Sequence, residues 1–438
     1  MIYIGDIDPI INLGNESNIE IYNDNYMVYP SGFVPYPRRY LTFRALESGT
    51  TFSFTNDIDY SVDDGNNWVT LSANTASPAI ESGDTIIWRE TLTPISGSGI
   101  GTFSSTGQFN AEGNIMSLLY GDNFVGQTSL SEKSYAFENL FSGCTGLTYS
   151  NNLILPATTL VQYCYSNMFN GCSSLIATPV LPASTLGRGC YYHMFEDCTS
   201  LVNAPQLPAT TLVQYCYDGM FKGCSSLTTA PVLSAITLAQ ECYRYMFSNC
   251  TSLTSAPALP ANTLSLECYH GMFFGCSGLT IAPVLSATTL AESCYSQMFY
   301  NCINLTTAPD LPATTLAVSC YDNMFAGCTS LTTAPELSAD TLTDSCYREM
   351  FYRCSGLTSA PILSATTLAD NCYRGMFSRC SNLNYIKMLA TDISATDCLT
   401  NWVDGVAATG TFVKSESQSS LQTGVNGIPS GWTVEDNV

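Results

Sequence analysis

The cysteines are the residues of this chain with the widest chemical range, because thiols can bind metals, form disulfides or act as nucleophiles. Ten of the twenty follow one another at a constant step of 26 residues, from Cys164 to Cys398. Nine more lie eight residues after the first nine of these, from Cys172 to Cys380. The last, Cys144, belongs to a degenerate first unit. Since every cysteine belongs to a repeat, the spacing predicts a solenoid.

A buried role explains such cysteines best. Free cysteine is among the most buried residue types, and methionines recur at the same step from Met168 to Met376. We therefore interpret both rows of cysteines and the row of methionines as ladders in a core. Disulfides between equivalent cysteines of successive units, or a metal site, are the alternatives.

Other catalytic groups are scarce. The two histidines, His193 and His270, lie three units apart. The chain shows no HExxH motif, no P-loop and no Ser-His-Asp order. Acidic residues of the repeat array fall at variable positions that we expect to face solvent. The sequence thus predicts no catalytic residue, no cofactor and no metal site, and hence a protein that is not an enzyme.

One short helix and one short extended segment are expected in each unit. Leu160, Cys164, Met168 and Cys172 are spaced by four, which is typical of the apolar stripe of a helix. Thr159 would cap this helix, with Gln162 completing a capping box. The segment that follows, Leu-Thr-Thr-Ala-Pro-x-Leu in its usual form, is typical of a short strand.

Stacking of the units would bury their apolar sides. Extended segments pack about 4.8 Å apart, whereas helices need about 8–10 Å. The helical side should then form the longer arc. This predicts an α/β fold, a curved leucine-rich-repeat-like solenoid with its helices outside.

The motif Met-Phe-x-x-Cys-x-x-Leu, followed by an apolar segment with proline, resembles the BspA-like leucine-rich repeat. In this chain Met stands where that family has a small residue, a second Cys replaces an apolar residue, and the unit is three residues longer. The resemblance covers more than half of the chain. It implies a surface or phage-encoded adhesive module without enzymatic activity.

The flanks suggest further parts. We assign residues 1–38 to an N-terminal docking arm, 39–113 to a β-sandwich-like domain and 114–150 to a linker and N-terminal cap. The solenoid then covers 151–397 and a C-terminal cap 398–438. The cap would bury the apolar residues Trp402, Val403, Val406, Phe412 and Trp432.

Six short strands are expected in the sandwich-like domain, at residues 41–43, 51–54, 58–60, 68–71, 85–88 and 101–103. Residues 63–67, Asp-Asp-Gly-Asn-Asn, have the composition of a hairpin loop. Asp57, Asp59, Asp63 and Asp64 could offer oxygens to calcium, but EF-hand spacing is absent. A solvated hairpin is the preferred interpretation.

Charge limits the choice of partner. The chain has 14 basic and 36 acidic residues, a net charge of −22, which argues against nucleic acid and anionic membranes. No apolar run is long enough to span a bilayer, so membrane insertion is not expected. The first residues, Met1 to Pro9, do not resemble a signal peptide; either a signal was removed or the protein leaves its cell by another route.

Comparison of the units indicates a candidate contact face. Two positions between Cys-Tyr and Met-Phe vary freely, as does the position after Phe. Unconstrained exposed positions would explain this, but the residues found there are typical of contact surfaces. The candidate residues are Tyr192, His193, Arg244, Tyr245, His270, Phe274, Tyr300, Arg348, Tyr352 and Arg374. The strand face is the rival surface, with its uniform Thr and Ser.

These observations favour a non-enzymatic adhesion protein, and among these a bacteriophage virion fibre or receptor-binding protein for host attachment. Its partners would be a host surface glycan or protein and, through the N-terminal region, other virion proteins. Self-association into a homo-oligomer is also expected. A bacterial cell-surface adhesin and a purely structural virion decoration protein are the alternatives.

Overall fold

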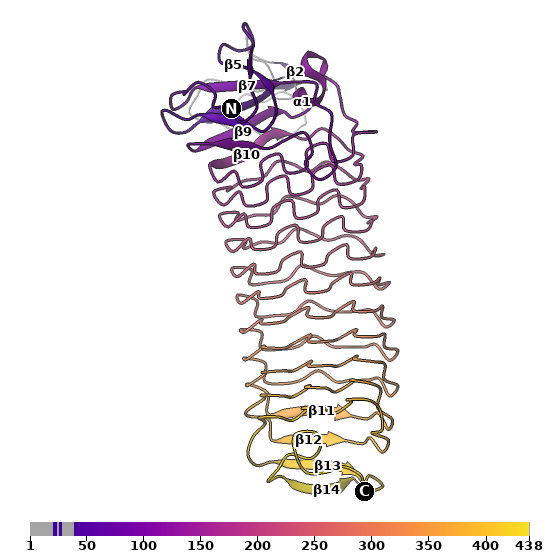
Figure 1. Cartoon of the computed structure of the whole chain (residues 1–438). Helices are drawn as coiled ribbons and strands as arrows, with labels where there is room; N and C mark the ends of the chain where they lie inside the picture. Colours follow the sequence, from indigo (N-terminus) through magenta and orange to yellow (C-terminus); the bar gives the residue numbers. More distant parts are fainter. Residues whose placement is uncertain (1–20, 24–25, 29–38, 438) are drawn as a thin grey trace.

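The computed structural model describes residues 21–23, 26–28 and 39–437. It is an elongated column of stacked coils with a sheet domain at the N-terminal end (Figure 1). The predicted solenoid is therefore confirmed. β1 (Ile21–Asn23) pairs with β2 (Tyr26–Val28) in an antiparallel hairpin. The rest of the predicted docking arm, residues 1–38, lies outside the described residues.

The N-terminal domain combines two sheets. A six-stranded sheet has the order β10-β9-β3-β7-β5-β6, in which β10 (Leu147–Ile154) comes from the first coil, and β4 pairs with β8 in a second sheet. The strands of this domain are β3 (Leu41–Ala45), β4 (Phe52–Phe54), β5 (Ile58–Ser61), β6 (Val69–Leu71), β7 (Thr85–Arg89), β8 (Phe103–Ser105) and β9 (Phe109–Asn114). Phe43 of the large sheet meets Phe52 and Phe103 of the small one at ring-centroid distances of 5.2 and 4.8 Å. Strands are confirmed at five of the six predicted places; the sixth, predicted at residues 101–103, begins only at Phe103, and β9 is an addition.

The sheet domain passes into the solenoid without a break in the core. After α1 (Ser117–Tyr120) and the 3-10 helix η2 (Gly121–Asn123), β10 (Leu147–Ile154) pairs in parallel with β9. The ring of Phe141 lies between those of Phe103 and Phe169, at 5.9 and 5.4 Å. The first coil therefore continues the core of the domain.

Each coil keeps its predicted extended segment. In the middle coils it makes single parallel bridges, such as Ile281 to Thr307 and Thr307 to Thr333. Towards the C-terminus these widen into full strands, β11 (Ser359–Leu363), β12 (Tyr385–Met388), β13 (Thr411–Ser415) and β14 (Thr433–Asn437), all paired in parallel. The extended side of the solenoid is thus a parallel ladder.

The predicted helix of each unit is wrong. Residues 162–171 form successive tight turns, in which alternate N–H groups bond within and between coils. The N–H of Ser166 donates to the carbonyl of Tyr163 at 3.2 Å, and that of Asn167 to Tyr192 of the next coil at 2.8 Å. An α-helix would keep these bonds within itself. Thr159 caps nothing and bridges in parallel to Thr185.

A left-handed residue recurs at every fourth position of the turns. In one coil these are Tyr163, Asn167 and Gly171, with φ of +51°, +52° and +72°. Glycine and asparagine adopt this conformation with the least strain. A reversal every four residues turns Cys164, Met168 and Cys172 inwards, as a helix would. The sequence spacing was therefore correct about the core and wrong about the backbone.

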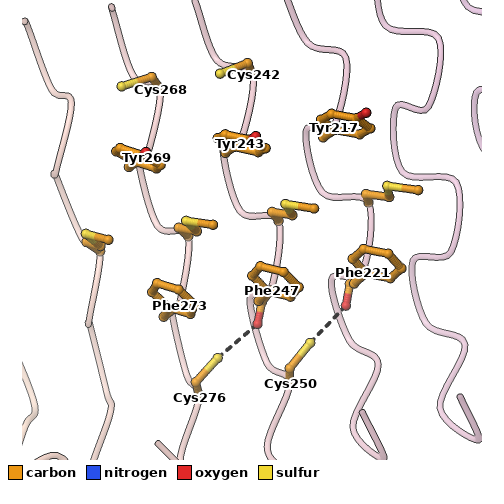
Figure 2. Close-up of a cluster of buried hydrophobic side chains, with 14 of the residues drawn as sticks. Tyr217, Phe221, Cys242, Tyr243, Phe247, Cys250, Cys268, Tyr269, Phe273 and Cys276 are labelled. Carbon is orange, nitrogen blue, oxygen red and sulfur yellow. Dashed lines mark hydrogen bonds between the residues drawn. The ribbon is translucent and has the colours of Figure 1, made fainter. Parts of the chain in front are cut away.

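The core consists of ladders of identical side chains, as Figure 2 shows. The rings of Phe221, Phe247 and Phe273 follow one another at 5.7 and 5.8 Å and lie within 7° of parallel. Tyr217, Tyr243 and Tyr269 form a second such ladder, at 5.9 Å. Burial of each Phe contributes about 1.5–3 kcal/mol through the hydrophobic effect, so each coil is stabilised by its neighbours.

All twenty cysteines are buried and free, as the core-ladder interpretation predicted. The row from Cys172 to Cys380 also has a polar role, because each thiol donates to the carbonyl of the preceding coil's phenylalanine. Cys250 Sγ, for example, lies 3.1 Å from the carbonyl oxygen of Phe221 (Figure 2). Burial raises the pKa of the Cys276 thiol to about 12. These thiols stay protonated at neutral pH.

The replacement of helices by turns also removes the predicted cause of the curvature, a helical side that needs a longer arc. Both sides of each coil now bond directly to the next coil through the backbone. The phenylalanine rings of the turn side are only 5.3–5.8 Å apart, well below the 8–10 Å that helices require. The column in Figure 1 accordingly bends only gently.

The C-terminal segment extends the column. Trp402 continues the phenylalanine ladder after Phe377, at 6.1 Å, and its indole N–H donates to the carbonyl of Gly427 at 2.9 Å. Of the residues expected in a cap, Trp402, Val403, Phe412 and Trp432 are buried and Val406 is partly buried. Within the described residues β14 is paired on one edge only.

Candidate functional site

We call the variable surface of the turn side the turn face. It consists of the residues two, three and six positions after the first cysteine of each coil, from Ser166 to Ser378. The ten residues predicted from sequence all lie on it: Tyr192, His193, Arg244, Tyr245, His270, Phe274, Tyr300, Arg348, Tyr352 and Arg374. Because the coils stack, these residues form three short rows along the column.

The turn face is less exposed than expected. Arg374 is exposed, while the other nine predicted residues are half-buried. The expectation that the acidic residues of the array face solvent is wrong for Asp218, Glu241 and Asp322, which are buried. The reason is that adjacent coils are spaced about as closely as adjacent strands of a sheet. A side chain on one coil therefore shields the equivalent side chain of the next coil from solvent.

One cluster surrounds Glu196. His193 Nδ1 and Lys222 Nζ lie 2.6 and 2.7 Å from its two carboxylate oxygens. Burial alone would raise the pKa of Glu196, but these two hydrogen bonds outweigh it and lower the pKa to about 2. The ring of Tyr192 packs on that of His193 at 4.1 Å. The predicted Tyr192 and His193 are therefore brought together, with an acidic partner that the sequence did not reveal.

A second cluster surrounds Arg244. Its guanidinium contacts Asp218 at 3.1 Å, Glu241 at 2.8 Å and Glu267 at 3.4 Å. Burial raises the pKa of Asp218 to about 6, although Arg244 opposes the shift. Three carboxylates thus surround one cation. Arg244 thus serves the contact between coils as well as the surface.

The other predicted residues also form pairs. Tyr245 Oη lies 2.9 Å from His270 Nε2, and burial lowers the pKa of His270. Phe274 and Tyr300 stack in parallel with centroids 4.7 Å apart. The structure thus joins side chains that belong to successive units of the repeat.

Two arginines of the predicted set have unequal partners. Arg348 bonds to the buried Asp322 through two nitrogens, at 3.0 and 3.1 Å. Arg374 has a 3.8 Å contact with Asp397, where both side chains are about half exposed, and donates to Asn371 Oδ1 at 3.4 Å. Arg348 is therefore fixed in the structure, whereas Arg374 is available to a partner.

Sequence reasoning missed two arginines beside Tyr352. The guanidinium carbons of Arg353 and Arg379 lie 5.0 and 5.9 Å from the centroid of its ring. Both arginines are exposed and occupy the position before the second cysteine of their coils. The signal was present in the sequence, because the seven complete units before them hold Gly, Asn or Asp at this position.

Other candidate sites offer fewer groups that could bind or react. Asp63 accepts hydrogen bonds from Ser61 and Asn67, which lower its pKa to about 2 and hold the predicted hairpin loop. A hollow near Gly97 and Asn139 is lined by no titratable side chain.

Over the described part of the chain, no three His, Cys, Asp or Glu residues are placed to hold a metal ion. No described helix is long and apolar enough to cross a membrane.

The arrangement of the turn face suits recognition. Its aromatic rings, guanidinium groups and amides offer stacking and hydrogen bonds at half-exposed positions. The nucleophilic thiols lie beneath it, protonated and buried. What differs from coil to coil is the surface, while the core remains the same.

Comparison with known families agrees with this architecture. The family model described as "BspA type Leucine rich repeat region", with six copies, matches residues 130–254, 178–306 and 292–397. These stretches together cover more than half of the chain. No curated protein matches the chain.

Proposed function

Because the chain belongs to the BspA-type leucine-rich repeat family, whose repeats are those of surface or adhesion-type proteins, we propose that it is a non-enzymatic recognition protein that attaches to a host surface. Its partner is a host glycan or protein bound on the turn face. One observation carries the proposal: variable aromatic and charged side chains cover a core of invariant ladders. Selection for stability alone would not require this variety.

The proposal extends to a place in the virion. A column with a sheet domain at one end has the shape of a fibre that docks through that end and presents the rest (Figure 1). The acidic surface, with a net charge of −22, disfavours nucleic acid and anionic membranes as ligands. We therefore place the sheet domain and the N-terminal residues against other virion proteins, and the turn face towards the host.

Two measurements test the proposal. Mass spectrometry of purified virions should detect this chain in a stoichiometric amount. Fluorescently labelled full-length chain should bind host cells, and unlabelled chain should compete with it. Detection in a bacterial cell envelope instead of virions would favour a cell-surface adhesin. Presence in virions without any cell binding would favour structural decoration and count against attachment.

A matched pair of variants asks whether the turn face is responsible. Phe274→Ser and Tyr300→Ser together remove the stacked aromatic pair, and Ser248 and Ser378 already occupy the same position in other coils. On the strand face, Val232→Thr and Val284→Thr change two exposed side chains. Loss of cell binding in the first variant alone supports the turn face. Loss in the second alone would move the site to the strand face.

A further inference from the structure

Arg353 and Arg379 lie on adjacent coils at equivalent positions of the repeat. Each is exposed, and each guanidinium lies within 6 Å of the centroid of the Tyr352 ring. Among the described residues, neither has a carboxylate within ion-pair distance. The backbone N–H of Arg379 bonds to the carbonyl of Asp404, but the Asp404 carboxylate does not pair with the guanidinium. Two like charges thus lie near the same aromatic ring without a counter-charge.

This arrangement is unusual within the chain. Acidic residues outnumber basic ones by 36 to 14, and other arginines of the turn face, Arg244 and Arg348, contact buried carboxylates. Repulsion between adjacent cations disfavours the folded state unless something offsets it. The missing counter-charge points to an anion supplied by a ligand.

The backbone conformation of the two arginines gives an independent reason to expect a ligand at this place. Arg353 and Arg379 have φ of +63° and +64°, in the left-handed region. The same position in the seven complete units before them holds only Gly, Asn or Asp, which tolerate this region best. Arginine is a poor choice for the conformation, so its use in two consecutive coils indicates selection for the side chain itself.

Tyr352 determines the kind of ligand. Its half-buried ring lies beside both guanidinium groups, and its hydroxyl has no hydrogen bond within the described residues. Paired guanidinium groups bind a carboxylate or sulfate through several N–H donors. A phenol provides a flat apolar face and one polar tip, as a pyranose ring requires. A long polyanion would meet the acidic surface beyond these few residues.

We propose that Tyr352, Arg353 and Arg379 form a binding site for an acidic saccharide, a sugar ring that carries a carboxylate or a sulfate. The guanidinium groups bind the anionic group, and Tyr352 contacts the ring and its hydroxyls. This deepens the proposed function, on which it rests, by naming the class of host ligand.

The test uses the full chain and short oligosaccharides immobilised in matched pairs, with and without one sulfate or carboxylate. The wild type should bind members of the acidic set and not their neutral counterparts. The double variant Arg353→Asn/Arg379→Asn should bind at least tenfold more weakly. Asn249 and Asn301 hold the same left-handed position in other coils, so this variant is expected to fold. Circular dichroism and the melting temperature check that it does.

Arg188→Gln is the control. Arg188 is an exposed arginine 5.3 Å from the ring centroid of Tyr215, on a distant coil, and its variant should bind like the wild type. Unchanged binding of acidic oligosaccharides by the double variant would overturn the proposal. So would inhibition by inorganic sulfate at the concentration at which the oligosaccharide inhibits, or equally strong arginine-dependent binding of single-stranded DNA.

The same proteins separate this inference from the proposed function. If the double variant still attaches to host cells but no acidic oligosaccharide binds the wild type, attachment stands and the acidic-saccharide site is wrong. If the wild type binds acidic oligosaccharides through these arginines but never binds host cells, the site stands and host attachment is wrong.

Discussion

The imidazole of His193 lies over the α-carbon of Gly219 in the next coil, so that a Cβ at position 219 would be 2.5 Å from its Cε1 atom. The same relationship joins Tyr245 to Gly271 and Tyr163 to Gly189. Left-handed residues of the turns therefore project along the column onto the following coil. At these three places a Cβ on the following coil would collide with the ring, and the residue there is glycine.

This relationship predicts that Gly219→Ala destabilises the protein by about 2–4 kcal/mol, through overpacking against His193 and a left-handed backbone. Gly143→Ala is the matched control, because Gly143 has φ of +73° and open space beside it. It should cost only about 1 kcal/mol. A double-mutant cycle with His193→Ala, followed by urea unfolding, should give a coupling above about 1 kcal/mol. Additive effects would show that ring and glycine do not interact.

The two rows of cysteines should respond differently to substitution. Cys250→Ala removes a thiol that donates to the carbonyl of Phe221, whereas Cys268 makes no such bond to a phenylalanine. Both are fully buried, so the packing loss is similar. We expect Cys250→Ala to lower the free energy of unfolding by about 0.5–1 kcal/mol more than Cys268→Ala, as measured by urea titration. Equal losses would mean that the hydrogen bond contributes nothing.

Arginines of the turn face should divide into structural and available ones. Arg348→Ala removes two hydrogen bonds and the counter-charge from the buried Asp322, which keeps only the bond from the Asn323 amide, and should destabilise by about 2–4 kcal/mol. Arg374→Ala removes only exposed contacts with Asp397 and Asn371, worth about 0.5 kcal/mol. Thermal unfolding measures both. Similar losses in the two variants would contradict the difference in burial, and the comparison shows which arginines are safe to replace in binding assays.

The lowered pKa of Glu196 predicts that the stability of the protein falls at acidic pH. Its folded-state pKa of about 2 is below the ordinary 4.5, so its contribution to stability is complete above pH 4.5 and is lost as the pH falls towards 2. The melting temperature of the wild type should therefore fall more steeply over this range than that of Glu196→Gln. Glu292→Gln, with an exposed side chain, serves as the control and should follow the wild type. Parallel curves for all three proteins would contradict the prediction.

The repeat and the core could be predicted from sequence because they depend on spacing. Cys164, Met168 and Cys172 are inward-facing in a helix and in a chain of four-residue turns alike, so their burial was predictable and their backbone was not. The distinguishing signal was the residue before each of them. Asn167 and Gly171 mark repeated left-handed positions, whereas a helix ends with only one such residue.

The position of the turn face could be predicted from sequence, but the pairing and burial of its residues could be predicted only in part. Variation between units identified Tyr245, Phe274 and Arg348. Their partners come from adjacent coils, and no local pattern pairs them. The burial of Asp218 was missed because it depends on the close approach of neighbouring coils. The strands of the N-terminal domain were easier to predict, since alternating apolar residues and turn-forming residues mark them locally.

The backbone bonds of the turns connect each coil only with the next, as from Phe247 to Met272. Deletion or duplication of one whole unit would therefore rejoin equivalent donors and acceptors and leave both ends unchanged. Each copy adds about as much height as the 5.8 Å between the rings of Phe247 and Phe273. The number of copies between them thus determines the distance of Tyr352 from the N-terminal domain.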